Sequence, residues 1–501
     1  MKRLLLVALI SGLACRSAHA QATDLASATT ASIATDPNIL SADDVRAAVE
    51  TAAQSVASPL VVAVTDRQGN ILAVYRKQNA PDTALGNFGA TVDANELAVA
   101  LARTAAFFSN DQAPLSTRTV RYISGIHFPP GVSYTSNADL YGIENTNRGC
   151  VLNTNFSPGV NLPPARSIDG SSPGLGIQTG KADLFDSDPN AVNPGGVPLF
   201  KNGHVVGGIG VVALNPAAAE YAALAAATSA PFAIVPAPPG VVIVGGIALP
   251  FVNQVAAPEP AGTLDGAYLM GPLPSPAAAP EGDLVALQDG SALTATDVRA
   301  ILDRAIATAN VTRAVIRLPL GSKTRMVIAV ADLNGTLLGL HRMPDATVFS
   351  VDVAVAKARN VIYFSQNPGN DLPGVPPGTA VNNRTIGFGA QPLFPPGIDT
   401  SNAGPFFSLF AFDSANPCTQ GSQPANPNQN GIVFFPGALP LYKNGVLVGG
   451  LGISGDGVDQ DDFVTSGAAA GFEAPTARRA DQISIDGVRL PYLKFPRNPK
   501  N

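Results

Sequence analysis

The chain has 501 residues, of which 46% are hydrophobic and 14% are charged, and its formal net charge is −6. An acidic chain without a basic run is a poor match for nucleic acid, and its apolar fraction is large enough to fill hydrophobic cores, which argues against a disordered chain. The 49 glycines and 44 prolines indicate a globular protein rich in loops, and the length allows two or three domains.

The N-terminus predicts a secretory signal peptide, residues 1–20. Two basic residues precede an apolar run, residues 4–13, that is too short to span a membrane. Ala18 and Ala20 are small residues placed for cleavage after position 20. Acylation at Cys15 is the alternative, but the residues before it make a poor lipoprotein signal. We therefore expect a periplasmic or secreted chain whose net charge is −9, because cleavage removes three basic residues.

Comparison of the chain with itself shows two diverged copies of one module. Six blocks recur in the same order, which predicts a first module at 39–255, an Ala/Pro-rich linker at 256–291 and a second module at 292–497. We expect the linker to be exposed and partly extended. The paired blocks are 40–46 and 293–299, 62–69 and 328–335, 102–109 and 358–365, 128–131 and 394–397, 198–203 and 440–445, and 249–251 and 490–492.

The repeat also bears on an uncharged segment, residues 230–252, that resembles a membrane span. Its counterpart, residues 478–492, carries five charged side chains. Two copies of one element are not expected to lie in lipid and in water respectively. We therefore predict no membrane span and interpret both segments as extended stretches that close each module.

Each module is predicted to begin with a helix. Ser41 and Thr294 are N-cap residues, and Asp44 and Asp297 follow three positions later in an approximate capping box. A hairpin, a second helix, a long Gly/Pro/Asn-rich excursion, a second hairpin with an Asn-Gly turn and a last helix follow in both copies. This order predicts an α+β fold in which a central antiparallel sheet carries packed helices. The expected elements are hairpins turning at 66–69, 201–203, 332–335 and 443–445, helices at 94–108, 217–227, 350–364 and 460–470, and excursions at 110–195 and 367–437.

The sequence contains one glycine motif but no catalytic signature. Residues 450–455 fit G-x-G-x-x-G, yet they follow a hairpin turn, so close packing of a helix on the sheet explains these glycines better than dinucleotide binding. We find no zinc-protease, nucleophile-elbow or phosphate-loop motif and predict no catalytic residues, which disfavours an enzyme. The histidines expected in the mature chain, His127, His204 and His341, are too scattered to define a metal site, and the metal question stays open.

Two groups of residues carry the site hypotheses from the sequence itself. Lys357 and Arg359 lie on the second helix of the second copy, where the first copy has Leu101 in place of the lysine. They are either a solvated edge with one structural arginine or a clamp for an anionic ligand. Cys150 and Cys418 lie at comparable places in the two excursions, so we predict a disulfide between them, with two free thiols as the alternative.

The combined pattern resembles the GlcG/HbpS-like family. The resemblance rests on the opening helix at 293–299, the hairpin at 328–342, the helix at 354–359 and the ending at 444–455, and it extends more weakly over the first copy. Some family members bind haem, some partner sensor kinases, and many oligomerise. The resemblance therefore implies a module for haem or a related small ligand, with a structural or protein-interaction module as the alternative. The expected ligand-binding residues are His341, Arg342, Lys357 and Arg359.

Overall fold

The computed structural model describes residues 38–135, 139–152, 167–181, 188, 190–235, 241–366, 369 and 371–500. The predicted signal peptide, residues 1–20, lies outside this part of the chain. Among the described residues, no helix combines the length and the apolar character that crossing a membrane requires.

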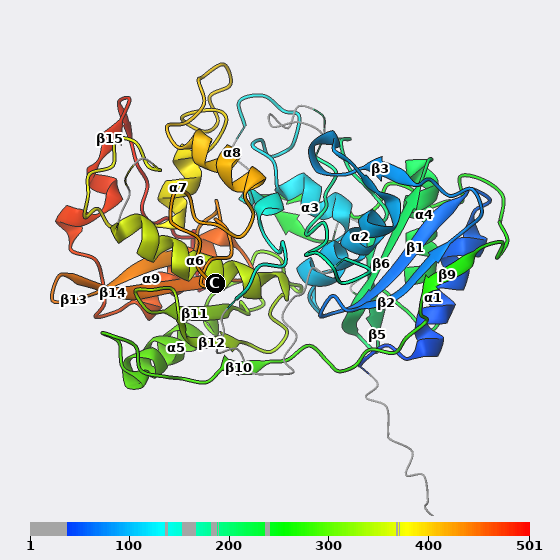
Figure 1. Ribbon diagram of the computed structural model, residues 1–501, viewed down its shortest axis with the longest axis horizontal. Coiled ribbons are helices and arrows are strands. Elements are labelled where there is room, and N and C mark those ends of the chain that lie inside the picture. Colours follow the sequence, from blue (N-terminus) through cyan, green and yellow to red (C-terminus); the bar gives the residue numbers. More distant parts are fainter. Residues whose placement is uncertain are drawn as a thin grey trace, which may run out of the picture. The chain divides into compact units, whose positions relative to one another are not determined.

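The first module is built on a five-stranded sheet in the order β5-β6-β1-β2-β9, and every neighbouring pair is antiparallel (Figure 1). Both predicted hairpins are present, and β6 and β1 join them at the centre of the sheet. The sheet strands are β1 (Leu60–Asp66), β2 (Ile71–Arg76), β5 (Gly196–Lys201), β6 (His204–Ala213) and β9 (Ala267–Met270), and a separate small hairpin is formed by β3 (Thr83–Leu85) and β4 (Thr91–Asp93).

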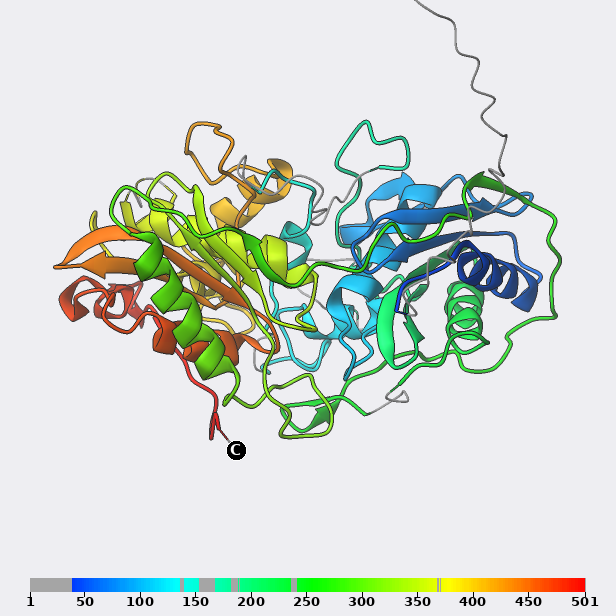
Figure 2. The same cartoon turned by 90° about the horizontal axis from the view of Figure 1, so that it is seen from below.

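Helices cover both faces of this sheet, which explains why every residue of β1 is buried. Val62 and Val64 pack with α1 (Ala42–Ser55) and α4 (Pro216–Ala227), and these two helices lie side by side (Figure 2). Val61 and Ala63 point to the opposite face and pack with α2 (Ala94–Phe108). Because strand side chains alternate between faces, a strand covered on both sides reads as a continuous apolar run.

The second module repeats this plan with a sheet in the order β10-β12-β11-β14-β13. α5 and α9 pack together, and α6 lies on β14, β11 and β13. The strands are β10 (Gly282–Val285), β11 (Val327–Ala331), β12 (Leu337–Arg342), β13 (Ala438–Lys443) and β14 (Val446–Ser454), and the helices are α5 (Ala295–Ala309), α6 (Phe349–Gln366) and α9 (Val458–Ala468). The predicted α+β fold with two tandem modules is therefore confirmed.

Local sequence signals explain where the opening helices begin. Ser41 Oγ accepts a hydrogen bond from Asp44 N at 3.1 Å, and the Asp44 carboxylate accepts one from Ser41 N at 2.8 Å. Thr294 and Asp297 form the same reciprocal pair at the start of α5. Each box satisfies two amide groups that a helix N-terminus leaves without partners inside the helix.

The glycines of the motif on β14 allow α6 to pack directly on the strand. A Cβ atom on Gly450 would lie 2.1 Å from Ala358 O, and one on Gly452 would lie 2.0 Å from Ala354 O. The first copy has the same approach, since a Cβ atom on Gly210 would lie 1.9 Å from a carbonyl oxygen of α2. The structural interpretation of this motif is therefore confirmed.

The linker contributes a strand to each module. β9 pairs with β2 and β10 pairs with β12, so the segment predicted at 256–291 supplies the outer strand of both sheets. The two predicted closing segments contain short hairpins. These are β7 (Ile243–Val244) with β8 (Ile247–Ala248), and β15 (Ser484–Ile485) with β16 (Val488–Arg489).

The two excursions contain helices that the sequence pattern did not indicate, and they pack against each other. Tyr141 stacks on Phe410 with ring centroids 5.0 Å apart, and Asn145 Nδ2 donates to Asp413 Oδ2 at 2.6 Å. The helical segments are α3 (Thr117–Ile123) and the 3₁₀ turn Ile143–Asn145 in the first excursion, and α7 (Asn383–Gly389) and α8 (Phe407–Ala415) in the second.

Cys150 and Cys418 form the predicted disulfide, with Cα atoms 5.2 Å apart. It links residues 268 positions apart and so ties the two excursions together covalently.

Replacing both cysteines by alanine should lower the free energy of unfolding by about 2–4 kcal/mol, because the unfolded chain loses a long closed loop. Denaturant unfolding with and without reductant measures this. Reduced wild type should match the double variant, and a variant that still responds to reductant would contradict the assignment.

Candidate functional site

Arg342 makes the same contact as its counterpart in the first copy. Arg342 Nε donates to Ala346 O at 2.9 Å, four residues further along the chain. Arg76 occupies the matching place at the end of β2 and donates to Ala80 O at 2.6 Å. Both arginines therefore fix the turn that follows the second strand of their module, and this contact does not distinguish the second copy.

Arg359 is also matched across the repeat. Its Nε atom donates to Gly335 O at 3.0 Å, and Arg103 Nε donates to Gly69 O at 2.8 Å. Gly335 and Gly69 are the glycines of the first hairpin turn in each module, and both have positive φ. The arginine thus holds this turn against the central helix in both copies and has the predicted structural role. The predicted solvated edge is wrong, because Lys357 and Arg359 are 0% and 1% exposed.

His341 lies on β12 beside the strand that the linker supplies. Its Nδ1 atom is 2.7 Å from Asp283 Oδ1 of β10. Its counterpart Tyr75 accepts a hydrogen bond from Gly266 N at 2.8 Å, next to β9. The replacement of Tyr by His therefore changes how a module contacts its linker strand. Neither of the other two histidines completes a metal cluster, because the described residues contain no group of three or more metal-ligating side chains.

Lys357 is the candidate residue that differs chemically between the copies and lies beside a cavity. Its side chain is fully buried, and Nζ donates to Ile453 O at 2.8 Å and to Asp461 Oδ2 at 2.9 Å. The ammonium also lies 5.1 Å from the ring centroid of Phe435. Burial raises the pKa of Asp461 and lowers the pKa of Lys357, because removal from water disfavours both charges. The four predicted ligand residues thus have four separate environments.

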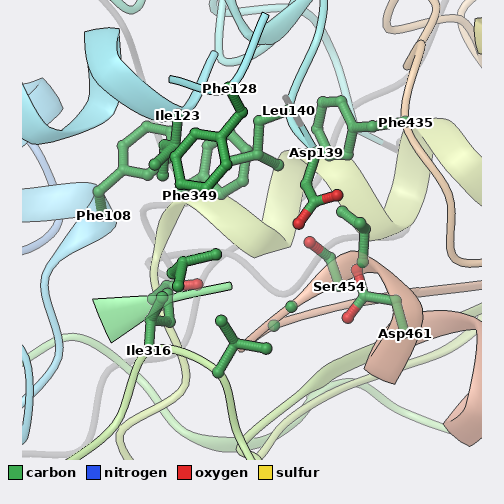
Figure 3. Close-up of a pocket in the computed structure, with 16 residues that line it drawn as sticks. Phe108, Ile123, Phe128, Asp139, Leu140, Ile316, Phe349, Phe435, Ser454 and Asp461 are labelled. Carbon is green, nitrogen blue, oxygen red and sulfur yellow. The ribbon is translucent and has the colours of Figure 1, made fainter. Parts of the chain in front are cut away.

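The cavity beside this ion pair is lined by both modules (Figure 3). The first copy contributes a cover from the end of α2, the end of α3 and its excursion, which is apolar except for Asp139, and the second copy contributes the starts of α6 and α9 and the end of β14. About 60 Å³ remain in which a water-sized molecule can be centred. The lining includes Phe108, Ile123, Phe128, Asp139, Ile316, Thr347, Phe349, Phe435, Ser454, Val458 and Asp461.

The first copy has a different hollow at the equivalent place. Strand register fixes the equivalence, because Gly210 lies opposite Ala63 of β1 and Gly452 lies opposite Ala329 of β11. The position of Asp461 is then taken by Ala219, which lines the first copy's hollow together with Leu101. Lysine and aspartate are thus both replaced by apolar residues.

The chain approaches itself closely where the ion pair is buried. Gly437 has a φ of 117°, and a Cβ atom there would lie 2.6 Å from Lys357 Nζ.

One member of the ion pair, Lys357, was found from the sequence by comparing the two copies. Asp461 was missed, because an acidic residue in the first turn of a helix is common. Comparison of the two last helices would have revealed it, since aspartate stands there opposite alanine.

The fold defines a class of protein, a tandem α+β module, and a cavity lies where its two copies meet. The family model described as "Haem degrading protein HbpS-like" matches residues 40–228 and 293–470. The chain belongs to this HbpS-like family and contains two copies of its module, as the resemblance predicted.

Curated relatives share only part of their length with this chain. The corrinoid adenosyltransferases PduO of Salmonella typhimurium and Citrobacter freundii are 27% and 28% identical over 165 and 151 residues, which are 33% and 30% of this chain. The alignments cover 37% and 33% of those proteins, so the chain spans about a third of their length. An uncharacterised 15.0 kDa protein of Citrobacter freundii is 27% identical over 143 residues, 28% of this chain and 72% of that protein.

Solved structures show similarity at low identity. The crystal structure of a PduOC:haem complex has 23% identity and a TM-score of 0.25, and it covers 37% of this chain and 98% of its own. The structure of a double mutant of Streptomyces reticuli HbpS has 18% identity and a TM-score of 0.22, and it covers 39% of this chain and 95% of its own.

Proposed function

We propose that this chain is an exported protein that binds haem or a related small ligand, and that the ligand site is the cavity between its two modules. The observation that carries the proposal is the buried Lys357–Asp461 pair at the cavity wall, which the first copy replaces by Leu101 and Ala219. A buried ion pair is costly to maintain and is not needed for the fold, since the first copy folds without it. Export is inferred from the predicted signal peptide and is consistent with the disulfide.

The family description makes haem the first ligand to compare with the cavity. Haem requires room for a macrocycle, an axial ligand and a setting that accepts two propionates. The lining residues include no histidine, cysteine, methionine or tyrosine, and their ionisable groups are the carboxyls of Asp139 and Asp461. The space of about 60 Å³ suits a few water molecules or one ring-sized ligand. A cavity of this size without an axial ligand therefore does not fit intact haem, and a smaller related ligand is favoured.

A neighbouring hollow shares Asp139 and Val458 with this cavity and is larger, with about 390 Å³ of room. It contains two cations, Arg384 and Lys494. Arg384 Nη2 lies 2.7 Å from Asp459 Oδ1, and Lys494 Nζ lies 2.9 Å from Asp459 Oδ2. Because these cations already have an anionic partner, this hollow offers no clear propionate site either.

The proposal is tested with a neutral probe and with haemin. Benzyl alcohol should bind the mature protein in ligand-observed NMR, and Ile316→Trp, which fills the cavity, should abolish that binding. The matched control Ile398→Trp changes an exposed isoleucine and should leave it unchanged. Binding that survives Ile316→Trp, or no binding to wild type, would contradict the cavity as the site. Haemin at micromolar concentration should give either no Soret shift or the same shift with wild type and with Ile316→Trp. A Soret shift that wild type shows and Ile316→Trp lacks would show that the cavity opens for haem.

A protein-interaction module is the second candidate function. Val132, Tyr134 and Ile398 are 48%, 63% and 50% exposed, and they come from both excursions. Asp399 accepts a hydrogen bond from Tyr134 N at 3.1 Å, which brings the two loop tips together. Other excursion residues, such as Tyr141 and Asn145, are buried against the other excursion and are not available to a partner, so we place this function second. It would gain support from a partner whose retention depends on Tyr134 but not on Ile316.

A further inference from the structure

The polar end of the cavity has an acceptor without a donor. Asp461 is 2% exposed, and its Oδ1 atom has no hydrogen-bond partner although Oδ2 receives the Lys357 ammonium. Asp139 and Ser454 face the same space, and Figure 3 shows the two carboxylates on either side of Ser454. A buried acceptor left unsatisfied destabilises the protein, so a ligand that donates a hydrogen bond here would remove that cost.

The remaining polar groups at this end are already engaged. Ser454 Oγ lies 3.1 Å from Ser350 Oγ, which lies 2.6 Å from Thr347 Oγ1. Lys357 is bound to Ile453 O and Asp461 Oδ2. The cavity thus has no free cation for an anionic ligand, and its open positions are carboxylate oxygens. This favours a ligand with a donor, and a positively charged donor most strongly.

The opposite end of the cavity is hydrocarbon. Phe108 of the first copy stacks on Phe349 of the second with ring centroids 4.1 Å apart, and Phe128 and Ile123 complete this side. Aromatic faces attract cations as well as apolar groups. A ligand that fits both ends therefore has an apolar body and a single donor group.

We propose that the cavity binds a compact primary or secondary amine, with its ammonium directed at Asp461 and Asp139 and its hydrocarbon body against the phenylalanine rings. This inference rests on the proposed function and specifies the ligand class of the same site. The first copy serves as an internal comparison, because its hollow has Ala219 and Val212 at the positions of Asp461 and Ser454. It offers no carboxylate at that point and is not assigned an amine.

Three probes of similar shape test the charge preference: benzylamine, benzyl alcohol and benzoate. In titrations of the mature protein followed by ligand-observed NMR, benzylamine should bind roughly tenfold more tightly than benzyl alcohol, and benzoate should bind most weakly. Asp139→Asn should lower benzylamine affinity by several-fold and benzyl alcohol affinity much less, because the amide keeps an acceptor oxygen but loses the negative charge. This position is suited to the test because Asp139 is exposed, so the substitution should not impair folding. Asp283→Asn, an exposed aspartate at the edge of the second sheet, is the matched control and should change neither affinity.

The outcomes distinguish the amine assignment from the proposal that the cavity is the ligand site. Equal affinity for benzylamine and benzyl alcohol, with both lost in Ile316→Trp, would overturn the amine assignment and retain the cavity as the site. An amine preference that survives Asp139→Asn unchanged, and also survives Asp461→Asn in a variant shown to be folded, would likewise overturn it. Failure of every probe to bind would overturn the proposed function itself.

Discussion

Replacing Arg317 by methionine should lower the free energy of unfolding by about 3–5 kcal/mol, because it removes one partner from a buried ion-pair cluster. The guanidinium is 1% exposed and donates to Asp456 and to Asp345 Oδ2, the latter at 2.6 Å. It also donates to Gln112 Oε1 of the first copy at 3.2 Å. Methionine fills the space but leaves Asp456, which is completely buried, without a counter-ion.

The cluster joins the two modules, which makes the effect global. Asp345 accepts a hydrogen bond from Arg67 at 2.8 Å and a bifurcated one from Asp111 N, which lies 3.1 Å from both carboxylate oxygens, and both donors belong to the first copy. Loss of Arg317 therefore weakens the junction that also encloses the cavity. We expect the variant to bind benzyl alcohol more weakly than wild type, in addition to unfolding at lower denaturant concentration.

Arg299→Met is the matched control for this prediction. Arg299 also has two carboxylate partners, Asp283 at 2.8 Å and Asp303 at 3.5 Å, but its side chain is 41% exposed. Exposed pairs contribute about 0–1 kcal/mol, so this variant should stay close to wild type. Urea unfolding of the three proteins gives the comparison. Equal losses for Arg299→Met and Arg317→Met would show that burial of the cluster is not the cause.

Much of the fold was predictable because the two copies repeat the same local sequence signals in the same order. Capping boxes at Ser41 and Thr294 and Asn-Gly turns in both copies are local signals, and their repetition fixed the order of elements. The edge strands β9 and β10 were not predictable in the same way. Their residues lie in an Ala/Pro-rich segment without alternation, and they become strands because each meets an unpaired sheet edge. The helices within the excursions depend similarly on tertiary contacts.

The candidate site was likewise predictable only in part. Comparing the copies identified Lys357 as a difference, but it could not show that Arg342 and Arg359 repeat the contacts of Arg76 and Arg103. The cavity cover could not be predicted at all, since Phe108 reaches Phe349 only when the modules are packed together. A sequence comparison finds which residues differ, whereas the site depends on which residues meet.

Lys357→Leu, which gives the second copy the first copy's residue, should lower the free energy of unfolding by about 3–5 kcal/mol at neutral pH. The substitution leaves Asp461 buried at a wall that also has Asp456 and Asp462 nearby, both of which raise the pKa of Asp461. Lys357→Leu combined with Asp461→Ala reproduces the apolar pair of the first copy and should recover most of the loss. Lys494→Leu, whose lysine side chain is 63% exposed, is the control and should change stability little.

The pH dependence provides the decisive check on this ion pair. Without Lys357 the pKa of Asp461 rises further, so the folded state holds a proton that the unfolded state releases above its ordinary carboxyl pKa near 4. The stability of Lys357→Leu relative to wild type should therefore improve as the pH falls from about 8 to 5, because protonation removes the unpaired buried charge. The double variant has no carboxyl at this position and should not show this trend. If Lys357→Leu loses the same free energy at both pH values, the loss comes from packing around Gly437 and Phe435, and the charge of Asp461 is not its cause.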